Sequence, residues 1–292
     1  MRARGAQYGR ALAALGAASA LAAGAAAPAA AAAPARGGER YVALGDSYTS
    51  GPGIPRQTDE NCARSSVNYP SLAAKQLHQK SFKDVSCSGA TTGDMWRAQG
   101  TNAPQLNALG KNTRLVTLGI GGNDIGFGDI IRTCAGLASS DPAGAPCRKQ
   151  FTPGGKDELT ARINATAPKI AKVLRDVHKK APNARVILVG YPTIMPDNGV
   201  GCLPSLPIAL GDVPYLRDTE KRLNTMLRAQ ARAAHIRFAD TYRPTAGHDV
   251  CKPTADRWVE GARPENPAAP FHPNARGEQA MATAVVAAVR AH

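Results

Sequence analysis

Short apolar runs alternate with longer segments of helical periodicity along most of this chain. Each run is too short for a helix and is rich in aliphatic or β-branched residues, and glycine directly follows the first, third and fourth. This pattern is typical of buried parallel strands that lead into loops. We predict strands at Tyr41–Leu44, Lys83–Ser86, Arg114–Leu118, Arg185–Val189 and Ile236–Ala239.

The segments between these runs predict helices that cover a sheet. In the longest segment, between 157 and 180, the apolar side chains fall on one stripe, as they do on a helix face that packs against a core. Strand and helix in alternation predict one α/β domain with a parallel sheet, whose ligands bind at the carboxyl ends of the strands. The predicted helices are Tyr69–Lys80, Asp157–Lys180, Val213–Ala234 and Asn274–Ala291.

The first residues differ from the rest and predict a secretory signal peptide. Arg2, Arg4 and Arg10 precede an apolar stretch that runs from Ala11 to about Ala27, and small residues that suit cleavage follow it. We predict a signal peptide over residues 1–32, a mature domain over 33–292 and an extracellular location. A membrane anchor is the alternative, but the stretch is mostly alanine, whereas a spanning helix needs strongly apolar residues.

Composition and charge narrow the function classes. The chain has 292 residues, of which 43% are hydrophobic, so it can form a full core. Residues 1–32 hold three arginines and no acid, so their removal lowers the formal net charge from +14 to +11. This charge favours anionic surfaces such as phospholipid headgroups or acidic wall polymers. Nucleic acid is disfavoured as a partner, because the basic residues are evenly spread and no known binding motif is present.

Six cysteines lie behind the predicted signal peptide, and an even number in an exported chain favours disulfides. No two have the spacing of a Cys-x-x-Cys zinc or redox motif, so we expect no metal. Many pairings are possible, and pairing in sequence order closes the most local loops. We therefore expect Cys62–Cys87, Cys134–Cys147 and Cys202–Cys251.

Three predicted loops and the segment before the last helix contain candidate catalytic residues. Ser47 follows the first strand, at the expected N-terminus of a helix, where backbone N–H groups stabilise the negative charge of an acyl-transfer reaction. Gly89 follows the second strand and Asn123 the third, and both could donate to an oxyanion. His272 precedes the last helix, where a histidine can act as a general base.

Each of these residues also has a plain structural interpretation. Ser47 could simply cap a helix, Asn123 lies in a common turn composition, and Gly89 could only relieve crowding. His272 could be a surface or capping histidine. None of the four segments is diagnostic alone.

Together the four segments resemble the sequence blocks of the SGNH, or GDSL, hydrolase family. GDSYTSG resembles the block that carries the nucleophile, GGND the asparagine block and HPNARGE the histidine block, and Gly89 matches the glycine block. GPGIP after the serine and the spacing of the six cysteines resemble the secreted actinobacterial lipases and esterases. The resemblance covers essentially all of residues 33–292.

This resemblance implies a three-layer α/β/α flavodoxin-like fold with a five-stranded parallel sheet, and ester hydrolysis without a cofactor or a metal. It implies Ser47 as the nucleophile and His272 as the base. The N–H groups of Ser47 and Gly89 and the Asn123 amide would form the oxyanion hole. Many members have an acid three residues before the histidine, but here that position is Ala269. We therefore expect a backbone carbonyl, that of Ala269, to orient His272.

The sequence thus predicts a secreted serine ester hydrolase, a lipase or esterase that acts on lipid esters through an acyl-serine intermediate. The alternatives are a phospholipase A-type enzyme, a polysaccharide deacetylase and a non-catalytic secreted binding protein on the same scaffold. We expect a monomer that contacts lipid surfaces transiently. We also expect the loop 198–213, through Leu206 and Ile208, to form part of an apolar wall for the acyl group.

Overall fold

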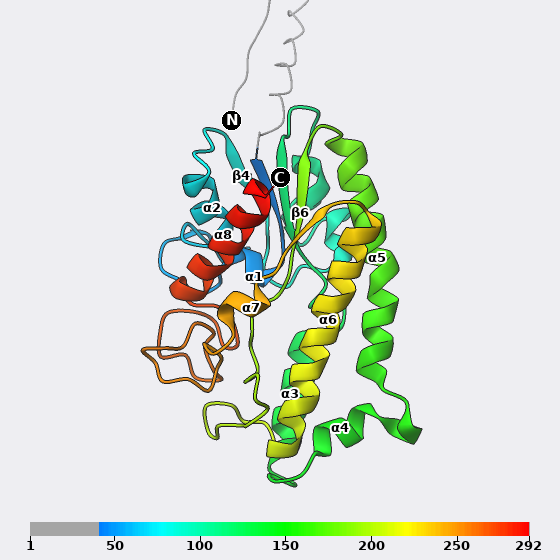
Figure 1. Cartoon of the computed structure of the whole chain (residues 1–292), viewed down its shortest axis with the longest axis vertical. Coiled ribbons are helices and arrows are strands. Elements are labelled where there is room, and N and C mark those ends of the chain that lie inside the picture. The colour runs from blue at the N-terminus through cyan, green and yellow to red at the C-terminus, as the bar shows by residue number, and fades with distance from the viewer. Residues whose placement is uncertain (1–40, 292) are drawn as a thin grey trace, which may run out of the picture. The chain divides into compact units, whose positions relative to one another are not determined.

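A five-stranded parallel sheet lies between two layers of helices in the computed structural model, which describes residues 41–291 (Figure 1). In spatial order the strands are β4 (Phe82–Asp84), β1 (Tyr41–Gly45), β5 (Leu115–Gly119), β6 (Arg185–Val189) and β7 (Arg237–Ala239). This order is that of the flavodoxin-like fold. The predicted fold class and all five strands are confirmed.

The helices divide between the two faces of the sheet because neighbouring strand residues point to opposite sides. Helices α2 (Tyr69–Gln76) and α8 (Ala275–Arg290) pack on one face, over Tyr41, Ala43 and Ile187. Helices α5 (Glu158–Lys180) and α6 (Val213–Ala233) pack on the other face, as Figure 1 shows. Both faces are therefore buried, which explains why the strands are almost continuously apolar.

The structure also contains elements that the periodicity did not predict. The longest are α3 (Phe127–Ala138) and α4 (Pro146–Phe151), which follow β5. Gly128 and Gly136 lower the helix propensity of α3, so its buried stripe is all that favours a helix there. The remaining elements are α1 (Ser47–Ser50), α7 (Tyr242–Thr245), β2 (Gln57–Asp59), β3 (Arg64–Ser65), and the 3₁₀ turns η1 (Thr92–Met95), η2 (Gln105–Ala108), η3 (Pro153–Gly155) and η4 (Leu210–Asp212).

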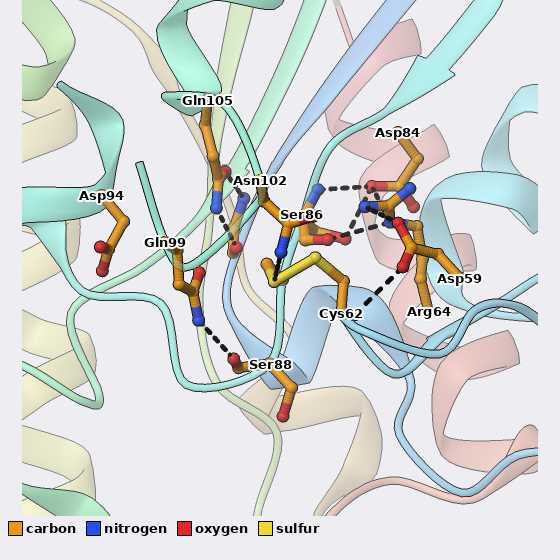
Figure 2. Close-up of a disulfide and its surroundings, with 12 residues drawn as sticks. Asp59, Cys62, Arg64, Asp84, Ser86, Ser88, Asp94, Gln99, Asn102 and Gln105 are labelled. Carbon is orange, nitrogen blue, oxygen red and sulfur yellow. Dashed lines mark hydrogen bonds and ion pairs between the residues drawn. A yellow bond between two sulfur atoms is a disulfide. The ribbon is translucent and has the colours of Figure 1, made fainter. Parts of the chain in front are cut away.

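The six cysteines form the three disulfides Cys62–Cys87, Cys134–Cys147 and Cys202–Cys251. The first joins the turn between β2 and β3 to the segment that follows β4. Figure 2 shows that this segment is also held by Gln99, whose Nε2 donates to the Ser88 carbonyl at 2.7 Å. The two residues that precede Gly89 are thus anchored.

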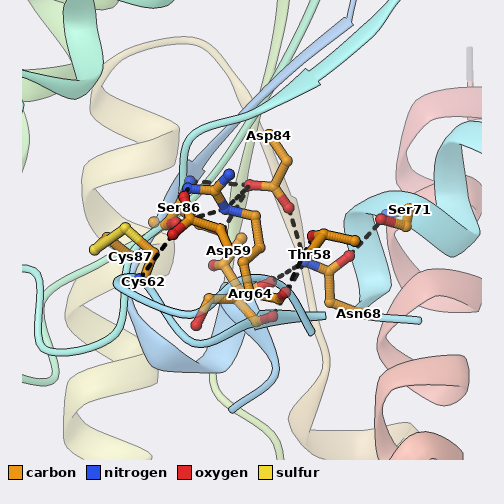
Figure 3. Close-up of polar contacts among 12 residues, drawn as sticks. Thr58, Asp59, Cys62, Arg64, Asn68, Ser71, Asp84, Ser86 and Cys87 are labelled. Carbon is orange, nitrogen blue, oxygen red and sulfur yellow. Dashed lines mark hydrogen bonds and ion pairs between the residues drawn. A yellow bond between two sulfur atoms is a disulfide. The ribbon is translucent and has the colours of Figure 1, made fainter. Parts of the chain in front are cut away.

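A buried polar cluster fixes the end of α1 to the end of β4 (Figure 3). Asn68 Nδ2 donates both to the Asp84 carboxylate, at 2.7 Å, and to the Thr49 carbonyl, at 2.9 Å. Arg64 Nε donates to the Ser86 carbonyl at 2.9 Å and lies 3.8 Å from the Asp84 carboxylate. Since α1 and the segment after β4 both lead to candidate site residues, the cluster holds these two segments in register.

The predicted signal peptide, residues 1–32, lies outside the described residues. Within 41–291, no helix is both long enough and apolar enough to cross a membrane.

Candidate active site

Ser47 is the first residue of α1, at the carboxyl end of β1. The N-cap is Asp46, whose carboxylate accepts the Tyr48 N–H at 3.0 Å, while the Asp46 N–H donates to the Gly119 carbonyl at the end of β5. Ser47 therefore lies where β1 meets β5, the point at which the strand order reverses and ligands bind in such sheets. Its exposed fraction is 7%.

His272 lies directly against Ser47. Its Nε2 is 2.8 Å from the Ser47 Oγ, and its Nδ1 is 2.8 Å from the Pro270 carbonyl oxygen. A carbonyl can only accept, so Nδ1 carries the proton and Nε2 accepts the hydroxyl hydrogen of Ser47. The ring is thus held in the tautomer that can remove a proton from the serine.

The carbonyl that orients His272 belongs to Pro270, one residue later than we predicted. The Ala269 carbonyl instead accepts the backbone N–H of His272 at 3.2 Å. Phe271, between Pro270 and His272, has a left-handed backbone with φ of 61°. This turn directs the Pro270 carbonyl toward the imidazole. Ala269, the position of the acid in many members of the family it resembles, thus binds the backbone of His272 and not its ring.

Contacts on both sides hold the loop that carries His272. The Tyr48 hydroxyl donates to the Phe271 carbonyl at 2.6 Å, and its ring stacks on the imidazole with 4.8 Å between centroids. On the other side, the Ala269 N–H donates to the Pro52 carbonyl at 2.8 Å. At Gly53 a Cβ would lie 2.7 Å from the Ala268 carbonyl carbon, so only glycine allows this close approach.

Gly89 and Asn123 lie on two loops that the structure joins. Asn123 Nδ2 donates to the Ala90 carbonyl at 2.8 Å, which places the amide beside the turn that contains Gly89. That turn needs the left-handed φ of 80° that Gly89 adopts. Within residues 41–291, the N–H groups of Ser47 and Gly89 donate to no acceptor of the chain. These two donors are therefore free to bind a substrate oxygen.

Tyr191, which the sequence did not indicate, connects the segment of Ser47 with the loop 119–124, which contains Asn123. Its hydroxyl donates to Asp46 at 2.5 Å and accepts the Gly122 N–H at 2.7 Å. Burial raises the pKa of Asp46 to about 7, although the hydrogen bonds from Tyr191 and Tyr48 oppose this. Asp46 had a recognisable signal, since aspartate before a helix is a common cap. Tyr191 lies in a loop without any such signal.

The pKa of His272 is lowered from its ordinary value because burial disfavours the imidazolium, and the Pro270 carbonyl offsets this only in part. The imidazole is therefore neutral near neutral pH and able to accept a proton. Among residues 41–291, no group of three or more histidine, cysteine or acidic side chains is arranged to hold a metal ion.

Two hollows lie beside these residues. An apolar cavity of about 50 Å³ lies between α3 and α6, lined by Tyr48, Gly122 and aliphatic side chains that include Ile131 and Met195. A larger groove, of about 570 Å³, is lined by Asn123 and Asp124 together with residues of η1 and α5, among them Lys169 and Lys172. The loop 119–124, which contains Asn123, thus contributes residues to both hollows.

Comparison with known proteins explains this arrangement. Residues 43–280 match the GDSL-like Lipase/Acylhydrolase family. The chain belongs to this family. It is 41% identical over 249 residues to Lipase 2 of Streptomyces coelicolor, with 83% of each chain covered. The chain is a carboxylic ester hydrolase of the lipase and esterase type.

Two solved structures share the fold and most of the chain's length. The crystal structure of phospholipase A1 from Streptomyces albidoflavus NA297 has a TM-score of 0.72 and 29% identity, and the match covers 87% of this chain and all of that one, 100%. The crystal structure of the extracellular lipase of Streptomyces rimosus has a TM-score of 0.71 and 28% identity, with 85% and 98% covered.

Proposed function

We propose that this chain hydrolyses lipid carboxylic esters through an acyl-serine intermediate on Ser47, with His272 as the general base. The observation that carries this proposal is the 2.8 Å contact between Ser47 Oγ and an imidazole whose other nitrogen is held by the Pro270 carbonyl. A serine is a weak nucleophile unless a neighbouring base removes its proton. The family's lipases and esterases support the same chemistry.

The reaction then has two halves. Ser47 Oγ attacks the ester carbonyl while His272 Nε2 takes its proton, and His272 returns that proton to the leaving alcohol. A water molecule, deprotonated by His272, then attacks the acyl-serine, and His272 returns that proton to Ser47 Oγ as the bond to the acyl group breaks and the acid leaves. In both halves we assign the oxyanion to the N–H groups of Ser47 and Gly89 and to Asn123 Nδ2, whose second hydrogen is not needed by Ala90.

We assign the acyl group to the apolar cavity between α3 and α6. Tyr48 lines this cavity and also stacks on His272, so one wall of the cavity lies next to the reacting groups. Its lining is almost wholly apolar, which suits a hydrocarbon chain. This assignment replaces the wall predicted for the loop 198–213, because Leu206 and Ile208 are fully buried in the core and do not line the cavity.

We also propose that the protein acts outside the cell. The three disulfides form in oxidising compartments, and the predicted signal peptide provides a route of export. The related Streptomyces rimosus structure is that of an extracellular lipase.

Kinetics of serine and histidine variants test the proposed function. Ser47→Ala, His272→Ala and the double variant should each lose about 10⁶ in kcat on p-nitrophenyl butyrate, since the two groups act as a unit. Ser50→Ala is the matched control, because Ser50 lies in the same helix and its buried hydroxyl has no partner in the described residues. Retention of a tenth of wild-type turnover by Ser47→Ala would show that another nucleophile acts.

A further inference from the structure

The groove beside Asn123 has more cationic than anionic side chains in its lining. Its lining includes Arg97 of the segment after η1 and Lys169 and Lys172 of α5, but only one carboxylate, that of Asp124. The groove has a volume of about 570 Å³, enough for a substantial part of a small molecule. The lining side chains thus carry a net positive charge, which favours an anionic ligand.

The one carboxylate is already used to join two loops. Asp124 accepts the Thr92 N–H at 2.8 Å and the Thr92 hydroxyl at 2.5 Å. The Lys169 ammonium lies 3.6 Å from it, an ion-pair distance that is too long for a hydrogen bond. Lys169 is half-exposed and keeps its N–H donors available to a ligand.

The Arg97 guanidinium makes no hydrogen bond or ion pair within residues 41–291, and the residue is exposed where it lines the groove. A guanidinium presents its donors in a fork that matches the oxygens of a phosphate. Lys172 lies 3.5 Å above the ring centre of Trp96 and 3.0 Å from the Asp176 carboxylate. Because Lys172 covers this aromatic face, the ring does not offer a free platform for stacking a sugar.

The groove and the apolar cavity meet at the loop 119–124. Gly122 lines the cavity, whereas Asn123 and Asp124 line the groove. An ester whose carbonyl oxygen binds Asn123 thus lies near both an apolar hollow for its acyl chain and a groove with cationic side chains. This division fits a molecule that is apolar at one end and anionic at the other.

We propose that the groove binds the phosphate of a glycerophospholipid, so that the leaving group of the preferred substrate carries a phosphate held by Arg97 and Lys169. The inference rests on the proposed function, because it places the headgroup relative to an ester cleaved at Ser47. It makes the chain a phospholipid acyl hydrolase rather than a lipase of neutral glycerides.

Two water-soluble substrates with the same acyl esters test the assignment, dihexanoyl phosphatidic acid and dihexanoylglycerol, both kept below their aggregation concentrations. The measured quantity is the ratio of kcat/KM for the first to that for the second. The ratio should favour the phosphate in wild type and fall about tenfold in Arg97→Ala/Lys169→Ala, which loses two charge-assisted contacts. It should also fall as salt screens these charges.

Arg175→Ala/Lys180→Ala is the matched control, because both residues are exposed on α5 and neither lines the groove. It removes the same charge and should keep the wild-type ratio, and the thermal unfolding midpoints of both variants verify that they fold. An unchanged ratio in the groove variant, an equal fall in the control, or a wild-type preference for dihexanoylglycerol would each overturn the inference while the proposed function stands. Hydrolysis of neither substrate would instead overturn the proposed function itself.

Discussion

At the scale of single residues, the site pairs a serine with a histidine, and no carboxylate of residues 41–291 bonds to the imidazole. The Pro270 carbonyl occupies the place of that carboxylate and selects the same tautomer. It carries no full negative charge, so it stabilises the imidazolium less than an aspartate would. Together with burial, this keeps the pKa of His272 low. The acid limb of the kcat/KM profile should therefore lie below the pH at which an ordinary histidine titrates.

Neutralising the nearby acids tests whether a carboxylate assists after all. Asp249→Asn, Asp256→Asn and Glu265→Gln should each stay within about tenfold of wild type in kcat, since Nδ1 of His272 is bonded to the Pro270 carbonyl. Replacement of a triad aspartate by asparagine lowers kcat about 10⁴-fold. Steady-state kinetics on p-nitrophenyl butyrate measure the difference, and a loss near that size in any one variant would refute the two-residue site.

The sequence was sufficient for residues whose chemistry depends on their own side chains. Ser47, Asn123 and His272 could be proposed from their positions after strands or before a helix, and the structure brings Ser47 and His272 into contact. The roles of Pro270 and Tyr191 could not be foreseen in this way. One acts through a carbonyl whose direction depends on the φ angle of Phe271, and the other bridges groups far apart in sequence.

At the scale of elements, the strands were predictable because both faces of the sheet are buried and the apolar runs are therefore continuous. Helices α5 and α6 were predictable from their long apolar stripes. Helix α3 was not, since two glycines weaken it and tertiary packing decides its structure. It matters for function because it forms one wall of the apolar cavity.

A bulky substitution on α3 tests the acyl assignment. Ile131→Trp fills part of the cavity and should shorten the preferred acyl chain, with kcat/KM for p-nitrophenyl octanoate falling about tenfold relative to that for the acetate. Arg132→Trp is the matched control, because Arg132 is the next residue of the same helix and is exposed. An unchanged chain-length profile in Ile131→Trp would exclude this cavity as the acyl site.

At the scale of the whole molecule, buried carboxyl groups link stability to pH. Burial raises the pKa of Glu220 to about 8, although the N–H groups of Ile194 and Met195 oppose this, and that of Asp46 to about 7. The folded chain thus holds protons that the unfolded chain loses near the ordinary pKa of a carboxyl group. The stability that these groups contribute is fully present at acidic pH, and it is lost as the pH rises through their pKa values in the folded chain.

Thermal unfolding midpoints measured between about pH 5 and pH 9 should therefore fall as the pH rises. Because folding lowers the pKa of His272, the stability that this residue contributes changes with pH in the opposite direction, but only near the pH at which it titrates. Glu220→Gln should flatten the decline, whereas Glu60→Gln, at an exposed site, should leave it as in wild type. A midpoint that rises from pH 5 to pH 8 in wild type would contradict this linkage.

The central claim is that Ser47 forms a covalent acyl intermediate because His272 removes its proton. Labelling with a fluorophosphonate, followed by peptide mass spectrometry, tests this most directly, because the probe reacts only with an activated serine and leaves a stable adduct. We expect one adduct per chain, on the peptide that contains Ser47, absent in Ser47→Ala and formed far more slowly in His272→Ala. An adduct on another serine, or full esterase activity in protein that takes up no label, would contradict the account.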